Sequence, residues 1–533
     1  MKNNKTHRMA ASSLAPLVAL AAAALFAVAS HPTHAAAPGI KSNSNAFALR
    51  AEESYITQPD GTAVYSWGYG CSNGASGISF APSMPNSRCP TMQIPGPTLI
   101  VTEGVPFSVT LTNGLPAAAG NTSILFPGLR LVSTSGGSAG VLTREASAGS
   151  PVTYNLVADS AGTRSYYSGT QGDLQIEMGL YGAIIVLPAA VPASCNTGLA
   201  AQNAAAKAAH DEADFRLAHA AYNHAATCYD REYLFQFSEV DLRIHRQTEE
   251  QLQAITACQS APNHGVCPSS LSVETEPYHP TYYMINGRSM PDDMDPNYAL
   301  QYPHQPYNGN PHMHPGELVL LRVIGTGRAQ HPFHEHGNHV RVLAHDGNLL
   351  LSQSDPTKLA GPLLFTTTTT PGQALDGIFY WTGKGLNWDV FGHGYDGDAS
   401  ACTPDANGYY TSNPSADNYY EWCGDHKKPL EKKPFGLVGS GGPVTLPDPN
   451  VLAAGPWYGG SPYLGPEATA RAVGATPIPP SGTVANDPGS EAGFAFMWHS
   501  HLERELTTNN AFPGGMMMMM LVDPRAFVID EAN

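Results

Sequence analysis

Residues 96–112 read GPTLIVTEGVPFSVTLT, and this stretch holds two short β-type runs, at 98–102 and 107–112, on either side of a turn at Gly104. Similar runs recur at 63–69, 162–167 and 183–187, again bounded by turn residues. Short strands at this spacing are typical of a β-sandwich. The sequence therefore predicts one sandwich over residues 45–190.

The composition supports an all-β chain of more than one domain. Of 533 residues, 42% are hydrophobic and only 13% are charged, which is enough apolar material for large cores. The 53 glycines and 45 prolines disfavour long helices and suit many tight turns. Strand-like runs resume after residue 229 and continue to about 525, so we expect a second sandwich there; a three-sandwich arrangement is the alternative.

Two insertions interrupt this pattern. Residues 191–228 are rich in alanine, with Lys207, Asp211, Glu212 and Arg216, and we expect a helical insertion there. Residues 386–490 are rich in Gly, Pro, Asn, Asp and Tyr without periodicity, which predicts a long loop insertion in the second domain.

The N-terminus predicts export. Residues 1–36 contain three cations, no acidic residue and an apolar run over 14–29, which is shorter than the roughly 20 residues that span a bilayer. We therefore expect a cleaved signal peptide, a secreted or periplasmic protein and no membrane span. The formal net charge of −17 argues against nucleic acid as a partner.

Eight cysteines fall in four close sequential pairs. An even number of cysteines in an exported chain favours disulfides, with metal thiolates as the less favoured alternative. The expected pairs are Cys71/Cys89, Cys195/Cys228, Cys258/Cys267 and Cys402/Cys423.

Two histidine clusters carry the candidate chemistry: HPFHEHG at 331–337 and WHSHLERE at 498–505. Residues i and i+2 of a strand share a face, so His334 and His336 would point one way, as would His499 and His501. Two adjacent strands could bring these four imidazoles to one transition-metal ion. The alternative is that the histidines donate to backbone carbonyls in a polar core. By the same strand parity, His331 and Ser500 would face the opposite side.

At these clusters the chain resembles the multicopper oxidases, the laccase-like enzymes built from cupredoxin β-sandwiches. The segments that resemble the family's strands and copper motifs are 96–104 with 113–115, 175–183, 331–337 and 499–505. The resemblance implies tandem cupredoxin-like Greek-key sandwiches and copper as the cofactor, with zinc also possible.

The chain departs from the family's copper motifs at several positions. The first motif's histidines are absent from TSILFPG at 122–128, and the second motif's are absent from YSG at 167–169. Ser500 stands where the type 1 copper cysteine belongs, and Glu505 replaces a type 1 histidine. A serine hydroxyl cannot replace the soft thiolate ligand of a blue-copper site. We therefore expect at most one well-held metal, at His334, His336, His499 and His501, with His331 as a further candidate ligand.

Two further motifs are weaker candidates for metal binding. PHMHP at 311–315 has the H-x-H spacing but reads as a solvated turn. The run of five methionines at 516–520 offers thioethers to Cu(I), although packing of Met516, Met518 and Met520 in a closing strand is the favoured interpretation.

Three functions are compatible with this sequence. The favoured one is an exported protein with degenerate copper sites that binds a single copper or other transition metal, with limited or no oxidase activity. The alternatives are a metal-free cupredoxin scaffold that binds cell-envelope partners and an atypical copper-dependent oxidoreductase. The partner, a small molecule or an envelope protein, is not identified by the sequence.

Overall fold

The computed structural model describes residues 37–384 except 75 and 263–264, residues 403–424 and 493–530, and the backbone of three short strands between 460 and 485. The predicted signal peptide, Cys402 and most of the predicted loop insertion lie outside these residues. The described residues all belong to one compact unit, Thr33–Asn533.

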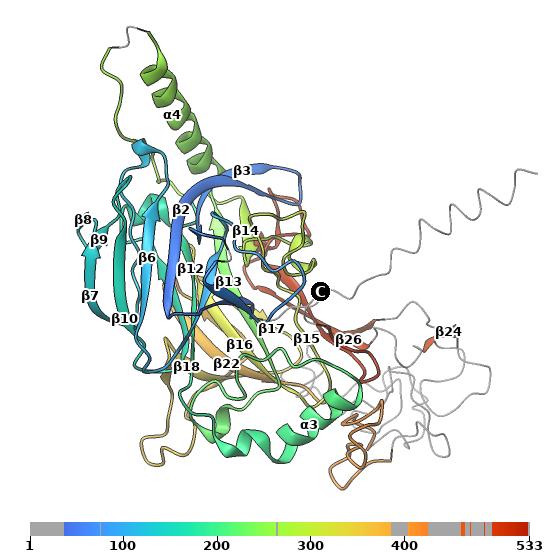
Figure 1. Ribbon diagram of the computed structural model, residues 1–533. Coiled ribbons are helices and arrows are strands. Elements are labelled where there is room, and N and C mark those ends of the chain that lie inside the picture. Colours follow the sequence, from blue (N-terminus) through green and yellow to red (C-terminus); the bar gives the residue numbers. More distant parts are fainter. Residues whose placement is uncertain are drawn as a thin grey trace, which may run out of the picture. The chain divides into compact units, whose positions relative to one another are not determined.

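The first part of the chain forms two five-stranded sheets, as predicted (Figure 1). Sheet 1 has the order β3 (Ala63–Cys71), β2 (Ala46–Thr57), β6 (Phe107–Asn113), β10 (Val152–Val157) and β7 (Arg130–Gly136). Sheet 2 has the order β11 (Gly162–Tyr167), β12 (Tyr181–Leu187), β5 (Gly96–Thr102), β1 (Gly39–Ser42) and β4 (Ile78–Ala81). A separate pair joins β8 and β9, at Ser138–Ala139 and Arg144–Glu145.

The second part forms two further sheets. Sheet 3 has the order β14 (Tyr282–Ile285), β13 (Arg231–Val240), β16 (Leu318–Gly325), β22 (Ala374–Tyr380), β18 (Val340–His345) and β19 (Asn348–Leu349). Strand β20 (Leu363–Leu364) also pairs with β18. Sheet 4 has the order β15 (His312–Met313), β27 (Met517–Val522), β26 (Gly493–Ser500), β17 (His331–Glu335) and β21 (Thr366–Thr369). The all-β class and its cupredoxin-like sandwiches are thus confirmed.

The predicted loop insertion also contributes backbone to the second domain. Strand β23 (Gly460–Tyr463) pairs with β26 and so joins sheet 4. Strands β24 (Thr469–Ala470) and β25 (Val484–Ala485) pair with each other. Strands of two to four residues are too short to produce a visible periodicity in the sequence.

Each sandwich has its own core, and sheets 2 and 3 pack against each other. Alternation along β12 sends Ile184 into the first core and Ile185 into a cluster with Leu234 of β13 and Ile324 of β16. Polar contacts cross the same boundary: the Thr163 backbone N–H donates to Asp376 at 3.0 Å. Since both faces of the sheets are covered here, β12 and β13 are buried along nearly their whole length rather than at alternate residues.

Within the described residues the helices are few and short, apart from one. They are α2 (Gly172–Gln175), α3 (Gly198–Ala209) and α4 (Leu242–Ser260), with 3₁₀ turns η1 (Ala117–Ala119), η2 (Ala193–Asn196), η3 (Ala225–Thr227), η4 (Asp292–Met294) and η5 (Glu503–Leu506). The expected helical insertion therefore contains a helix of only 12 residues. The chain leaves the helix after Ala209 because Asp211 takes a positive φ of 56° and Glu212 turns inward to buried cations.

The sequence reading missed α4, which Figure 1 shows extending past the strands beside β3. The Asp241 side chain accepts from the Arg243 N–H and caps the helix start. Buried residues recur at helical spacing as Ile244, His245, Thr248, Leu252 and Ile255. The helical spacing of these residues and the capping aspartate were the sequence signals that could have predicted α4.

Three of the predicted disulfides are present, Cys71–Cys89, Cys195–Cys228 and Cys258–Cys267. The fourth lies partly outside the described residues because it includes Cys402. Among the residues that the structure describes, no helix is long and apolar enough to cross a membrane.

Candidate metal site

Strands β17 and β26 position the histidines. The two strands pair antiparallel, and His334 lies directly opposite His499. Their neighbours Phe333 and Trp498 point into the second core. Alternation therefore directs His334 and His499 to the other face of sheet 4, away from that core.

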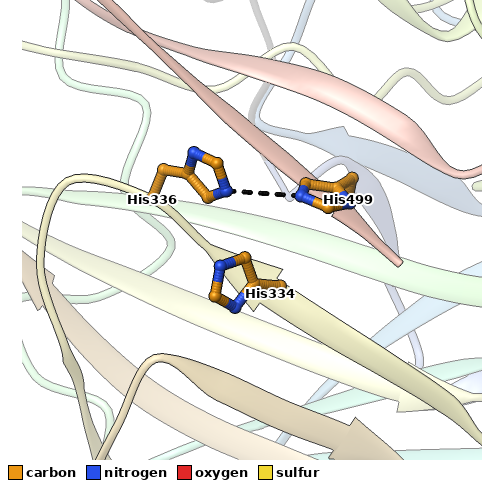
Figure 2. Close-up of side chains that lie close together, drawn as sticks. All are labelled: His334, His336 and His499. Carbon is orange, nitrogen blue, oxygen red and sulfur yellow. Dashed lines mark hydrogen bonds between the residues drawn. The ribbon is translucent and has the colours of Figure 1, made fainter. Parts of the chain in front are cut away.

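Three histidines meet on this face, as Figure 2 shows. One ring nitrogen from each of His334, His336 and His499 can be chosen so that all three lie within 4.8 Å of one another. Nε2 of His336 and Nε2 of His499 are 3.3 Å apart. Two nitrogens that bind one ion at 2.0–2.1 Å with a tetrahedral angle lie about 3.3 Å apart, so this spacing suits a shared transition metal.

Hydrogen bonds to the other side of the rings fix their orientation. Nδ1 of His499 donates to the Ser500 carbonyl at 2.7 Å, so Nε2 is its ligand-capable nitrogen. Nδ1 of His334 lies 2.7 Å from the Thr366 hydroxyl, and the Trp498 indole N–H donates to the His336 carbonyl at 2.9 Å. Such outer contacts are what orient imidazole ligands in metal sites.

His501 borders this group without belonging to the three. Its ring centroid is 4.8 Å from that of His334 and 5.5 Å from that of His499. Its side chain is 54% exposed and lies 3.9 Å from the Glu503 carboxylate. It could therefore reach a metal at the cluster by a side-chain rotation.

The surroundings favour neutral imidazoles. Burial, reinforced by the neighbouring imidazoles, lowers the pKa of His334 to about 4. Burial also lowers the pKa of His499. Neutral imidazole is the form that coordinates metals, so both rings are in the ligand-capable state at neutral pH.

His331 is not placed with this group, although it was a candidate ligand. It is fully buried on the core side, where Nε2 pairs with Glu239 and Nδ1 pairs with Glu505, each at 2.9 Å. The Ser500 hydroxyl donates to the same Glu505 oxygen at 2.5 Å. Burial alone would lower the pKa of His331, but the two carboxylates outweigh it and raise the pKa to about 9. A protonated, doubly paired imidazole offers no nitrogen to copper.

Hydrogen bonds tie the two degenerate first-domain motifs to Gln175. The Thr122 and Ser168 hydroxyls both donate to Oε1 of Gln175, at 2.9 and 2.7 Å. Leu125 and Tyr167, from the two degenerate motifs, form a β-bridge. These side chains satisfy one another in the space between the motifs.

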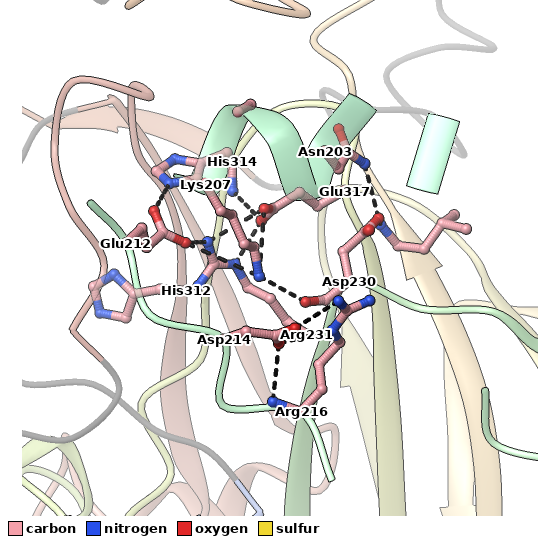
Figure 3. A network of polar contacts seen from close by, with 12 residues as sticks. Asn203, Lys207, Glu212, Asp214, Arg216, Asp230, Arg231, His312, His314 and Glu317 are labelled. Carbon is pink, nitrogen blue, oxygen red and sulfur yellow. Dashed lines mark hydrogen bonds and ion pairs between the residues drawn. The ribbon is translucent and has the colours of Figure 1, made fainter. Parts of the chain in front are cut away.

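The expectation of a solvated turn at 311–315 is wrong. His312 and His314 are fully buried; Nδ1 of His312 pairs with Asp523 at 2.7 Å and Nε2 of His314 with Glu212 at 2.8 Å. Figure 3 shows His314 in a network around Arg231, which pairs with Glu212 and Glu317, and His312 beside it. The network joins the 191–228 insertion to the second sandwich, a contact that local sequence cannot reveal.

The methionine run packs as expected. Met516, Met518 and Met520 are buried in the second core, on the side of sheet 4 opposite the histidines. Their thioether groups therefore pack within the second core.

Sequence reasoning missed two residues around the histidines. Glu239 lies 92 positions before His331 and carries no motif. Thr366 begins the run of five threonines at 366–370. This β-branched run was the sequence signal that could have predicted a strand there.

A family model described as multicopper oxidase matches residues 90–190, within the first sandwich. Over these residues the predicted resemblance to the multicopper oxidases is confirmed. No curated protein sequence matches it significantly.

Solved copper proteins are similar at low identity. The multicopper oxidase mgLAC is 15% identical, with 91% of this chain and 87% of that chain covered and a TM-score of 0.44. A blue copper oxidase from Nitrosomonas europaea is 15% identical, with 90% and 85% covered and a TM-score of 0.42. A copper nitrite reductase from the same organism is 17% identical, with 63% and 84% covered and a TM-score of 0.37.

Proposed function

We propose that this chain is an exported multicopper-oxidase-like protein that holds a single transition-metal ion, copper in the first instance, at His334, His336 and His499. His501 supplies a fourth nitrogen. The observation that carries the proposal is the convergence of three imidazoles on one face of sheet 4, with two Nε2 atoms 3.3 Å apart. Imidazole sets of this kind suit copper and zinc alike.

At the centre of the cluster, His336 and His499 share a proton that a bound metal ion would displace. Because Nδ1 of His499 donates to a carbonyl, its neutral ring accepts at Nε2, and His336 donates across the 3.3 Å contact. Binding the ion requires His336 to give up the proton at Nε2 or move it to Nδ1. The surrounding residues contribute orientation, while the metal supplies Lewis acidity or a redox centre.

Oxidase turnover of the laccase type is limited or absent in this proposal. Ser500 provides no thiolate, and His331 is held between Glu239 and Glu505 at the position that the resemblance assigns to the type 1 site. We therefore expect no intense blue absorption from the copper-loaded protein and no rapid oxidation of phenols.

Copper titration of the mature protein tests the site. At a hundredfold excess of Cu(II) over the dissociation constant, binding should stabilise the fold by about 2.7 kcal/mol, seen as a rise in melting temperature. His334→Ala and His499→Ala should each remove most of that rise and weaken binding in calorimetry. His279→Ala, at an exposed histidine outside the cluster, is the matched control and should retain both.

Equal copper effects in all three variants would place the metal elsewhere. Absence of saturable Cu(II) or Zn(II) binding by the parent would leave the second candidate, a metal-free scaffold that binds envelope partners. The absence of histidines from the first-domain motifs and the two carboxylates that bind His331 favour that candidate.

A further inference from the structure

A groove of about 810 Å³ lies between α4 and the first sandwich, outside the histidine cluster. One wall is the exposed side of α4, and the other comes from β2, β3 and the segment after β6. The His245 side chain contacts the Tyr65 carbonyl and holds the base of the helix against β3. The groove is thus a fixed feature of the packing between α4 and the sheet.

Two carboxylates face the groove from opposite walls. Glu53 comes from β2, and Glu249 comes from α4. The Tyr65 hydroxyl donates to Oε2 of Glu53, and the Tyr55 hydroxyl donates to Oε1 of Glu249. In the part of the chain that the structure describes, the second oxygen of each carboxylate makes no hydrogen bond, so each can accept from a ligand.

The two tyrosines add aromatic surface to the carboxylates. Their ring centroids are 5.7 Å apart at an interplanar angle of 69°, and Tyr55 is 47% exposed. Aromatic faces attract ammonium groups and cover methylene chains. The hydrogen bond to Glu249, with some burial, raises the pKa of Tyr55, so its hydroxyl remains a donor.

The charged residues that line the groove are all negative. Its lining residues include two carboxylates and no lysine, arginine or histidine. Arg50 lies against Gly114 at the rim, where it pairs with Glu52 at 3.3 Å. The protein as a whole has a net charge of −17, which further favours cationic ligands.

From this geometry we infer that the groove between α4 and the first sandwich binds aliphatic polyamines. Ammonium groups of the ligand pair with the outer oxygens of Glu53 and Glu249, and its methylene chain lies along Tyr55 and Tyr65. Charge-assisted hydrogen bonds on both walls select for a ligand with at least two ammonium groups separated by hydrocarbon. A compact inorganic dication has no methylene chain to lay along the rings.

Calorimetric titration of the full mature chain with spermidine at low salt tests this inference. One saturable site is expected, and Glu53→Gln and Glu249→Gln should each weaken it tenfold or more. Glu250→Gln removes the same charge from the next residue of α4, which does not line the groove, and should change the dissociation constant less than twofold. Circular dichroism checks that each variant is folded.

Three results would overturn the inference: no saturable binding, equal weakening by Glu250→Gln and Glu249→Gln, or MgCl₂ binding as tightly as spermidine. The last two would mean that only the net charge attracts the cation. His334→Ala should bind spermidine like the parent, so this test is independent of the proposed metal.

Discussion

At the scale of single residues, His331 forms an internal ion pair rather than joining the other histidines. Glu505 and Glu239 bind the two nitrogens of His331, and Ser500 donates to Glu505. A buried charge needs such partners, because losing its hydration costs several kcal/mol. His331 is therefore explained as a structural cation, whereas His334, three residues later, faces the opposite side and other imidazoles.

The pH dependence of stability should report this ion pair. The pKa of His331 is about 9 in the folded protein against 6.5 for an ordinary histidine. Its contribution is fully present below pH 6.5 and is lost as pH rises toward 9, because the unfolded chain has already released the proton. The loss amounts to at most about 3 kcal/mol. Urea unfolding between pH 6 and 9 measures it.

Glu505→Gln is the comparison that isolates His331. It removes one of the two carboxylates, so the decline between pH 6.5 and 9 should become shallower. Burial also raises the pKa of Glu335 to about 8, which lowers stability with rising pH in both proteins and cancels in the comparison. An unchanged slope in Glu505→Gln would show that His331 does not hold the proton.

At the scale of elements, alternation along two strands separates the core from the site. β17 and β26 place Phe333 and Trp498 on one face of sheet 4 and His334 and His499 on the other. A slip of one residue in their pairing would exchange the faces. The buried Phe333 and Trp498 therefore fix the register that opposes His334 to His499.

Helix α4 should be held mainly by its buried face. Ile244 is fully buried in the first core, so Ile244→Ala should lower the free energy of unfolding by about 2–5 kcal/mol. Gln259→Ala, at an exposed position of the same helix, should change it by less than about 0.5 kcal/mol. Chemical unfolding measures both, and equal effects would contradict this account of α4.

At the scale of the whole described unit, four sheets stack so that the first sandwich meets sheet 3 rather than the histidine face of sheet 4. Buried charges cross the boundary between sheets 2 and 3. Arg322 pairs with Glu232 at 2.8 Å and lies 3.7 Å from Asp376, which accepts from Thr163 of the first sandwich. The two sandwiches are thus linked by polar as well as apolar contacts.

Removing the central cation should destabilise this boundary. Arg322→Met leaves two buried carboxylates without their partner and should cost about 3–5 kcal/mol in the free energy of unfolding. Arg130→Met breaks the exposed pair with Asp159 on the first sandwich and should have little measurable effect. Similar losses in the two variants would contradict the role given to Arg322.

The sequence by itself determined the all-β class, three of the disulfide pairs and the gathering of histidines. Each of these follows from local regularities: strand spacing, the proximity of paired cysteines and the period of two along a strand. His334 and His499 could be placed on matching faces because both flank buried aromatic residues.

Only the tertiary structure decided which charges these elements meet. Glu239 reaches His331 from 92 residues away, and Glu212 reaches His314 from 102 residues away. Such pairs come from different strands and insertions, so no local pattern predicts them. His312 and His314 read as a solvated turn for this reason: a polar segment can be buried when distant side chains satisfy its hydrogen bonds.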